Sequence, residues 1–258
     1  AEMLRAGTTT FSDMYFYPDA CARTAQRMGM RCQISFPMLD FPTPWAREAD
    51  EYISKGLGLR DAVKHSSLVS VGFGPHAPYT VSHPNLAKVA MLAAELDTSI
   101  QIHLHETRGE VLQAVEAHGE RPLDSLYRLG LLGPRTQCVH MTDLGEQDIA
   151  LLAETGAHVV HCPKSNMKLA SGACPVTRLL AAGVNVALGT DSAASNNSLN
   201  LFDEMRSAAL LAKLASQDAS ALSAAEALHM ATLGGARALG LEEQIGSLEQ
   251  GKLADLIA

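Results

Sequence analysis

Short runs of β-branched and apolar residues alternate along this chain with longer stretches in which apolar positions recur at helical spacing. This alternation is typical of successive strand and helix units around a parallel sheet. Gly29, Gly156 and Gly183 each follow an amphipathic stretch, where a glycine is a stop signal for a helix. The predicted strands cover residues 8–14, 31–38, 68–73, 99–104, 136–140, 158–161 and 184–188.

Seven such units, with an eighth expected ahead of Ala1, predict an α/β fold of the (β/α)8 TIM-barrel type with its first strand missing. A doubly wound open sheet is the alternative. The chain opens on what reads as the last turn of a helix and closes on an apolar segment, so we expect a fragment of a longer protein. Residues 1–240 are expected to form the incomplete barrel, and residues 241–258 the start of a smaller domain.

Composition narrows the function to small-molecule chemistry. The chain has 258 residues, enough for one large domain with a full core, and a formal net charge of -8. The absence of a basic run argues against binding to nucleic-acid phosphates, and no apolar run is long enough to span a membrane. The five cysteines are scattered and form no C-x-x-C pair, which indicates reduced thiols in a cytoplasmic protein.

One predicted strand ends in histidines followed by a carboxylate, in the stretch Ser99-Ile100-Gln101-Ile102-His103-Leu104-His105-Glu106-Thr107. Because side chains alternate along a strand, we expect His103 and His105 to point to the same face. Glu106 lies where the strand breaks. A neutral imidazole is a good zinc ligand, and a nearby carboxylate can carry protons. The alternative is a barrel strand with two half-buried, hydrogen-bonded histidines.

Polar residues end five of the predicted strands, and in a TIM barrel the catalytic groups lie at the carboxyl ends of the strands. Any one of these residues could be a core histidine or a capping aspartate, but five together favour an active site. The strand ends are Gly74-Pro75-His76-Ala77-Pro78-Tyr79, His103 to Glu106, Val139-His140, His161-Cys162-Pro163 and Gly189-Thr190-Asp191-Ser192.

Chemistry suggests a role for each of four residues. Asp191 offers an oxygen ligand and His103 a nitrogen ligand to zinc. His140 could orient or deprotonate an attacking water, and Glu106 could take its proton and return it to a leaving group. Catalytic zinc usually takes three protein ligands. His140 and His105 are the possible third ligands here, and a His-x-His pair upstream of Ala1 would complete the set.

These motifs closely resemble the amidohydrolase superfamily, specifically the 5-methylthioadenosine/S-adenosylhomocysteine deaminases. The likeness runs almost from end to end of the chain. It is carried by Gly74-Pro75-His76-Ala77-Pro78-Tyr79-Thr80, His103-Leu104-His105-Glu106-Thr107, Val139-His140-Met141, His161-Cys162-Pro163-Lys164-Ser165-Asn166-Met167-Lys168-Leu169, Leu188-Gly189-Thr190-Asp191-Ser192-Ala193-Ala194-Ser195-Asn196-Asn197 and Gly251-Lys252-Leu253-Ala254-Asp255.

The resemblance implies a set of roles. It makes His103 and Asp191 ligands of one zinc ion per subunit, and Glu106 the proton-shuttling carboxylate of an H-x-x-E element that also binds the substrate. His140 would hydrogen-bond the reacting water, and Asp191 would also have a catalytic role by holding that water in place with His140. His76 would contact the purine, whereas His105 would have no catalytic role. Residues 241–258 would begin a composite β-sandwich domain. The expected partner is a small nucleoside, and a homo-oligomer is possible.

The reaction implied by the resemblance is hydrolytic deamination at adenine C6, which makes the chain a hydrolase acting on the C–N bond of a cyclic amidine. Hypoxanthine would replace adenine and ammonia would leave. Ser35-Phe36-Pro37 stands where some members have an arginine for the homocysteine carboxylate, so the preference between the two substrates stays open. The alternatives are a related amidohydrolase acting on guanine, cytosine or a chlorinated triazine, and an inactive fragment.

Overall fold

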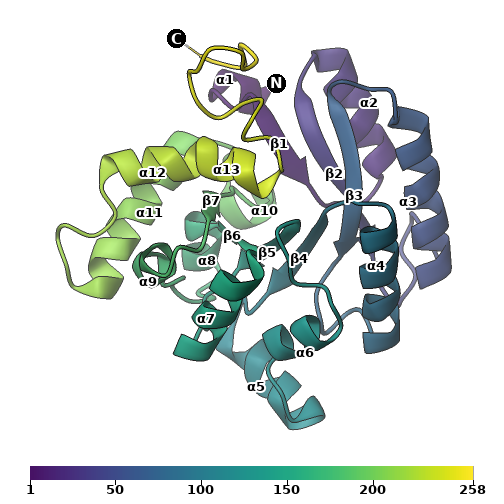
Figure 1. Ribbon diagram of the computed structural model, residues 1–258, viewed down its shortest axis with the longest axis horizontal. Helices are drawn as coiled ribbons and strands as arrows, with labels where there is room; N and C mark the ends of the chain where they lie inside the picture. Colours follow the sequence, from purple (N-terminus) through teal and green to yellow (C-terminus); the bar gives the residue numbers. More distant parts are fainter. Residues whose placement is uncertain (258) are drawn as a thin grey trace.

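A single parallel sheet of seven strands organises the molecule (Figure 1). The computed structural model describes residues 1–257. Each strand pairs in parallel with the next one along the chain, so the spatial order is the sequence order. The strands are β1 (Thr10–Asp13), β2 (Arg31–Met38), β3 (Val69–Pro75), β4 (Ile100–Leu104), β5 (Thr136–His140), β6 (His158–His161) and β7 (Val186–Leu188).

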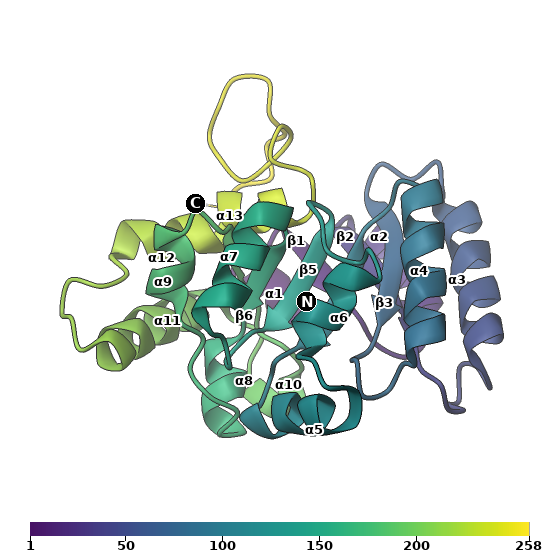
Figure 2. The same ribbon diagram turned by 60° about the horizontal axis from the view of Figure 1, so that its bottom comes forward.

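The strand order decides between the two predicted architectures. A doubly wound sheet reverses direction at a switch point, whereas this sheet runs from β1 to β7 without reversal, so that alternative is wrong. The sheet curls, and the helices between the strands cover its outer face (Figures 1 and 2). Among the described residues no ladder joins β7 back to β1. The prediction of a TIM-type barrel one strand short of eight is confirmed.

Glycines that the sequence marks as stop signals end two of the helices. α2 has a proline in its first turn and ends at Gly29, whose φ of 65° is left-handed, and Gly156 ends α7 at a φ of 71°. The helices are α1 (Glu2–Arg5), α2 (Pro18–Met28), α3 (Ala49–Val63), α4 (His83–Glu95), α5 (Arg108–His118), α6 (Pro122–Arg128), α7 (Glu146–Thr155), α8 (Pro163–Lys168), α9 (Val176–Ala181), α10 (Ala193–Asn196), α11 (Leu201–Ser216), α12 (Ala224–Ala231) and α13 (Leu233–Ala238).

The two faces of the sheet differ in polarity. Phe36 and Phe73 lie on the helix-covered face with ring centroids 4.9 Å apart. Gly56 of α3 lies so close to Phe36 that a Cβ there would clash with the ring. The inner face is polar and hydrogen-bonded, since Gln137 donates to Oε1 of Gln33 over 2.6 Å. The apolar core therefore lies between sheet and helices, and polar side chains are reserved for the barrel interior.

Residues 241–257 form turns and extended chain, in which the structure assigns neither helix nor strand. The segment returns to the barrel, because Asp255 pairs with Arg31 of β2 at 2.9 Å. A domain boundary near residue 240 stays a prediction, and residue 258 lies outside the described residues. No described helix is both long enough and apolar enough to cross a bilayer.

Candidate active site

The carboxyl ends of β3, β4 and β5 bring four predicted site residues together. His76 directly follows β3, His103 lies in β4, Glu106 follows β4 and His140 ends β5. The ring centroids of His76 and His103 are 5.0 Å apart, and those of His103 and His140 are 5.4 Å apart. Nε2 of His140 lies 3.8 Å from Oε2 of Glu106. These side chains form one polar cluster at the end of the barrel where catalytic groups are expected.

His103 has the environment of a metal-binding histidine. Its Nδ1 lies 2.7 Å from the backbone oxygen of His76 and donates to it, because a carbonyl can only accept. Nε2 is then the unprotonated nitrogen. Burial lowers the pKa of His103, which favours the neutral ring that a metal ligand requires. A ring N–H bonded to a backbone carbonyl is also the usual support of a metal-ligating histidine.

Asp191 lies just beyond β7 in a left-handed conformation, with φ at 57°. Its Oδ2 accepts hydrogen bonds from Oγ of Ser165 at 2.6 Å and from Oγ of Ser195 at 2.7 Å. Its Oδ1 accepts from the backbone N–H of Ser192 at 2.7 Å. Burial raises the pKa of Asp191, but these hydrogen bonds outweigh it and hold that pKa below its usual value. Asp191 is therefore a fixed, ionised oxygen donor.

His140 and Glu106 form the acid–base part of the cluster. Nδ1 of His140 is 2.9 Å from Oδ1 of Asn166, and His140 has a left-handed φ of 78°. Glu106 accepts a hydrogen bond at Oε1 from Ser171, over 3.3 Å, and its other oxygen faces His140. The Glu106 side chain is about one-fifth exposed, at 21%. A carboxylate placed in this way can exchange protons with a molecule bound beside it.

His105 does not share a face with His103, which corrects the expectation from strand alternation. β4 ends at Leu104, and His105 takes a φ of 48° that turns it to the helix side. There it is fully buried, its Nδ1 donates to the Asp143 carbonyl at 2.9 Å, and its Nε2 accepts from the Leu123 N–H at 3.2 Å. Because both ring nitrogens are engaged, His105 is a structural residue and is not available as a third metal ligand.

The residues that hold the cluster in place had no predicted role. Ser165, Asn166 and Ser195 all lie within motifs quoted above, but a serine or asparagine in a loop gives no sign of its partner. Their position in the sequence was the one available indication, because Ser165 and Asn166 lie in the first turns of a helix that directly follows a strand end. Glu204 of α11 was also missed, since it lies inside an amphipathic helix in sequence.

The donor types fit zinc in kind. An imidazole nitrogen and a carboxylate oxygen are normal zinc ligands, and His103 and Asp191 supply one of each. Two buried polar atoms without a hydrogen-bond partner, Nδ1 of His161 and Nδ2 of Asn166, also belong to strand-end motifs. Within residues 1–257, however, no three histidine, cysteine or acidic side chains are grouped to hold a metal. His103 and Asp191 are thus two candidate ligands, where catalytic zinc usually takes three from the protein.

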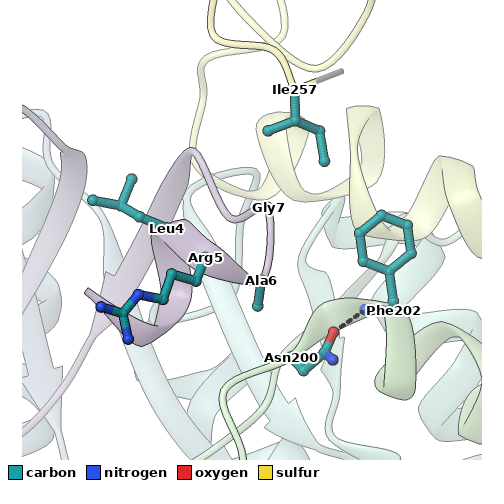
Figure 3. A pocket seen from close by; sticks show the side chains of 7 residues that line it. All are labelled: Leu4, Arg5, Ala6, Gly7, Asn200, Phe202 and Ile257. Carbon is teal, nitrogen blue, oxygen red and sulfur yellow. Dashed lines mark hydrogen bonds between the residues drawn. The ribbon is translucent and has the colours of Figure 1, made fainter.

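A cavity of about 350 Å³ is lined by residues near both ends of the described chain and by none of the cluster residues (Figure 3). Arg5 is its only charged lining residue, and the Asn200 side chain there caps α11 by accepting from the Phe202 N–H. It contains no acid–base pair and no metal donor set, so we do not assign it to catalysis. It is lined by Leu4, Arg5, Ala6, Gly7, Asn200, Phe202 and Ile257.

Known proteins with similar sequences include nucleoside deaminases. The chain is 56% identical over 258 residues to a 5-methylthioadenosine/S-adenosylhomocysteine deaminase of Teredinibacter turnerae, covering 100% of this chain and 58% of the relative. It is 46% identical over 261 residues to a 5'-deoxyadenosine deaminase of Methanothermobacter thermautotrophicus, covering 99% of this chain and 60% of the relative. The chain thus spans rather more than half the length of the curated relatives it matches.

Solved structures share the fold. An adenosine deaminase from Xanthomonas campestris with bound zinc matches with a TM-score of 0.96 and 50% identity, over 98% of this chain and 58% of that one. The zinc complex of an atrazine chlorohydrolase from Arthrobacter aurescens matches with a TM-score of 0.91 and 27% identity, over 98% of this chain and 60% of that one. The amidohydrolase family model matches residues 1–258, and the chain therefore belongs to the amidohydrolase family.

Proposed function

We propose that this chain carries the catalytic residues of a zinc-dependent deaminase that converts the adenine of 5-methylthioadenosine or S-adenosylhomocysteine to hypoxanthine. The observation that carries the proposal is the 3.8 Å approach of the Glu106 carboxylate to His140, beside His103. This arrangement suits acid–base chemistry on a bound water. The names of relatives at 56% and 57% identity support the same activity.

His103 and Asp191 would hold the zinc, together with ligands that the described residues do not provide. Bound zinc would lower the pKa of water toward neutrality and so supply a nucleophile at working pH. Burial keeps His103 neutral, and three hydrogen bonds hold Asp191 as a carboxylate. Each residue would therefore be in the protonation state that metal binding needs.

The other residues would move and place protons. Glu106 would accept a proton from the water that attacks C6 and pass it to the amino group, which departs as ammonia. His140, held through Nδ1 by Asn166, would orient the water with Nε2. His76 would contact the purine, since its ring adjoins that of His103. The sum of these steps is addition of one water and loss of one ammonia.

A second activity has specific support. The chlorohydrolase from Arthrobacter aurescens has a matching fold at 27% identity, so the same barrel can serve a triazine. The guanine, cytosine and triazine alternatives therefore stay in the test. Because relatives of 46% to 57% identity carry nucleoside deaminase names, the nucleoside reaction is the better supported. An inactive fragment is the non-enzymatic alternative.

The test is ammonia release from zinc-supplemented protein with 5-methylthioadenosine, S-adenosylhomocysteine, 5'-deoxyadenosine and adenosine, beside guanine, cytosine and a chlorotriazine. The 258-residue chain should be assayed next to a chimaera that adds the parts of the Teredinibacter relative that it does not match. We expect turnover of the adenine nucleosides by the chimaera. Turnover of a triazine or guanine alone would contradict the proposal, and turnover by the short chain would show that His103 and Asp191 need no upstream ligands.

Three further properties belong to the same proposal. The five cysteines are free in the structure, and four of them are buried, which supports a reducing, cytoplasmic location. We propose small nucleosides as partners and a homo-oligomer as a possible assembly. Residues 241–258 would begin a β-sandwich domain. Mass measurement of the native protein would test the assembly.

A further inference from the structure

Glu204 is a completely buried carboxylate on a helix outside the barrel. It lies in α11 and its exposed fraction is 0%, whereas the neighbouring Asp203 side chain is 53% exposed. Burying a carboxylate costs free energy unless hydrogen bonds replace the lost water. The partners of Glu204 should therefore indicate why a charge is kept at this position.

The two oxygens of Glu204 hold two different segments. Oε1 accepts from Nδ2 of Asn196 in α10 at 2.7 Å, and Oε2 accepts from the backbone N–H of Lys164 in α8 at 3.2 Å. These short helices are far apart in sequence, yet α10 and α11 both pack against α8. The carboxylate of Glu204 thus ties α8 and α10 to one point on α11.

Both tied segments carry a serine that bonds Asp191. Ser165 follows Lys164, Ser195 precedes Asn196, and both hydroxyls donate to Oδ2 of Asp191. Asn196 makes a further link, because its Nδ2 also donates to the backbone oxygen of Thr190 at 2.6 Å, one residue before Asp191. Two routes therefore lead from Glu204 to the Asp191 carboxylate, one through Ser165 and one through Ser195. A third leads through Asn196 to the backbone oxygen just before Asp191.

We propose that Glu204 is a positioning residue that fixes the Asp191 carboxylate in its metal-binding place. The inference rests on the proposed role of Asp191 as a zinc ligand. Asp191 needs such support because its φ of 57° is an unfavourable conformation for a residue with a side chain, one that only its surroundings can maintain. A carboxylate is required because both oxygens accept hydrogen bonds, whereas an amide would turn one acceptor into a donor.

The competing explanation is that Glu204 only holds helices together. In that case its loss would lower the stability of the fold without changing metal binding more than other destabilising changes do. Residues that support a metal ligand behave differently, since their substitution typically weakens metal affinity by about 10–100-fold. Zinc affinity therefore separates the two explanations.

The decisive variant is Glu204→Gln, which keeps the size of the side chain. Glu154→Gln is its matched control, because it makes the same substitution at an exposed residue of α7. The readouts are the zinc dissociation constant by chelator competition and deuterium exchange of residues 190–197, in both the chain and the chimaera. We expect Glu204→Gln to weaken zinc binding about 10-fold or more and to speed that exchange. The control should match the unmodified protein in both.

The proposal is overturned if Glu204→Gln folds and both its zinc affinity and its exchange over residues 190–197 equal those of the control. If Glu204→Gln does not fold, Asn196→Ala decides, because it cuts the links to Glu204 and Thr190 but leaves both serines. A failure of the proposed function is distinguishable, since a protein that binds zinc but deaminates nothing still reports on Glu204. If the unmodified chimaera binds no zinc, the metal role of Asp191 is wrong and this inference falls with it.

Discussion

Asn166 fixes the ring of His140 through a 2.9 Å hydrogen bond between its Oδ1 and Nδ1 of His140. Because an amide oxygen can only accept, Nδ1 carries a proton, and Nε2 is the nitrogen that faces the Glu106 carboxylate at 3.8 Å. Both residues are buried, at 1% exposure each, so water cannot replace the bond. The proposed acid–base pair of His140 and Glu106 therefore depends on Asn166, which holds only the His140 ring through this bond.

Replacing Asn166 should reduce turnover without removing the zinc. We expect Asn166→Ala to lower kcat by about 10-fold or more, because losing a buried hydrogen-bond partner costs about 1–3 kcal/mol and frees the His140 ring. Asn166→Asp keeps an acceptor and should retain more activity than Asn166→Ala. The measurement is kcat of the deaminating protein with zinc content checked in parallel. Equal kcat in Asn166→Ala and the unmodified protein would show that His140 needs no such support.

Glu106→Gln should separate metal binding from proton transfer. The amide keeps the shape of the side chain but cannot take a proton, so kcat should fall by about 100-fold or more while zinc content stays the same. Glu116→Gln is the control, because Glu116 is an exposed residue of the adjoining α5. Zinc content by elemental analysis and kcat by ammonia release are the readouts. Loss of zinc from Glu106→Gln would mean that Glu106 is a ligand and not the proton carrier.

His76 should affect substrate binding without affecting the metal. Its backbone oxygen, which a substitution leaves in place, supports His103, whereas its ring bonds Oγ1 of Thr80 at 3.0 Å. Burial lowers the pKa of His76 to about 4, so the neutral ring is present at pH 7. We expect His76→Ala to raise KM about 10-fold, the loss of one hydrogen bond, with zinc content unchanged. An unchanged KM would remove His76 from the substrate site.

The sequence alone was enough to predict the barrel and to place His103 on the functional face of its strand, because both predictions follow from regular periodicity. It was misleading for His105, since strand alternation holds only while the strand continues, and the left-handed turn at residue 105 ends it. The link from Glu204 to Asp191 was beyond reach for another reason. It joins three segments, at residues 164–165, 195–196 and 204, whose proximity is set by packing around α8 and not by any local pattern.

Acid should destabilise the fold in part through His161. Burial lowers the pKa of His161 to about 3, with the nearby His140 as a smaller cause, whereas the unfolded chain has a pKa of about 6.5. Between these values the unfolded state binds a proton that the folded state does not. The contribution of His161 to the free energy of unfolding is therefore complete above about pH 6.5 and is lost as the pH falls, by about 2 kcal/mol at pH 5.

The variant that isolates this effect is His161→Leu. Nδ1 of His161 has no hydrogen-bond partner among the described residues, so leucine leaves no polar group unpaired there. The variant must be compared directly with the unmodified protein, because Glu110 changes the stability in the opposite direction. Burial raises the pKa of Glu110 to about 7, so this residue favours the folded state as the pH falls. Urea unfolding at pH 7 and pH 5 should show a loss of stability about 2 kcal/mol smaller in His161→Leu than in the unmodified protein. An equal loss in both proteins would mean that His161 is protonated in the folded state, and that the polar end of the barrel admits enough water to charge it.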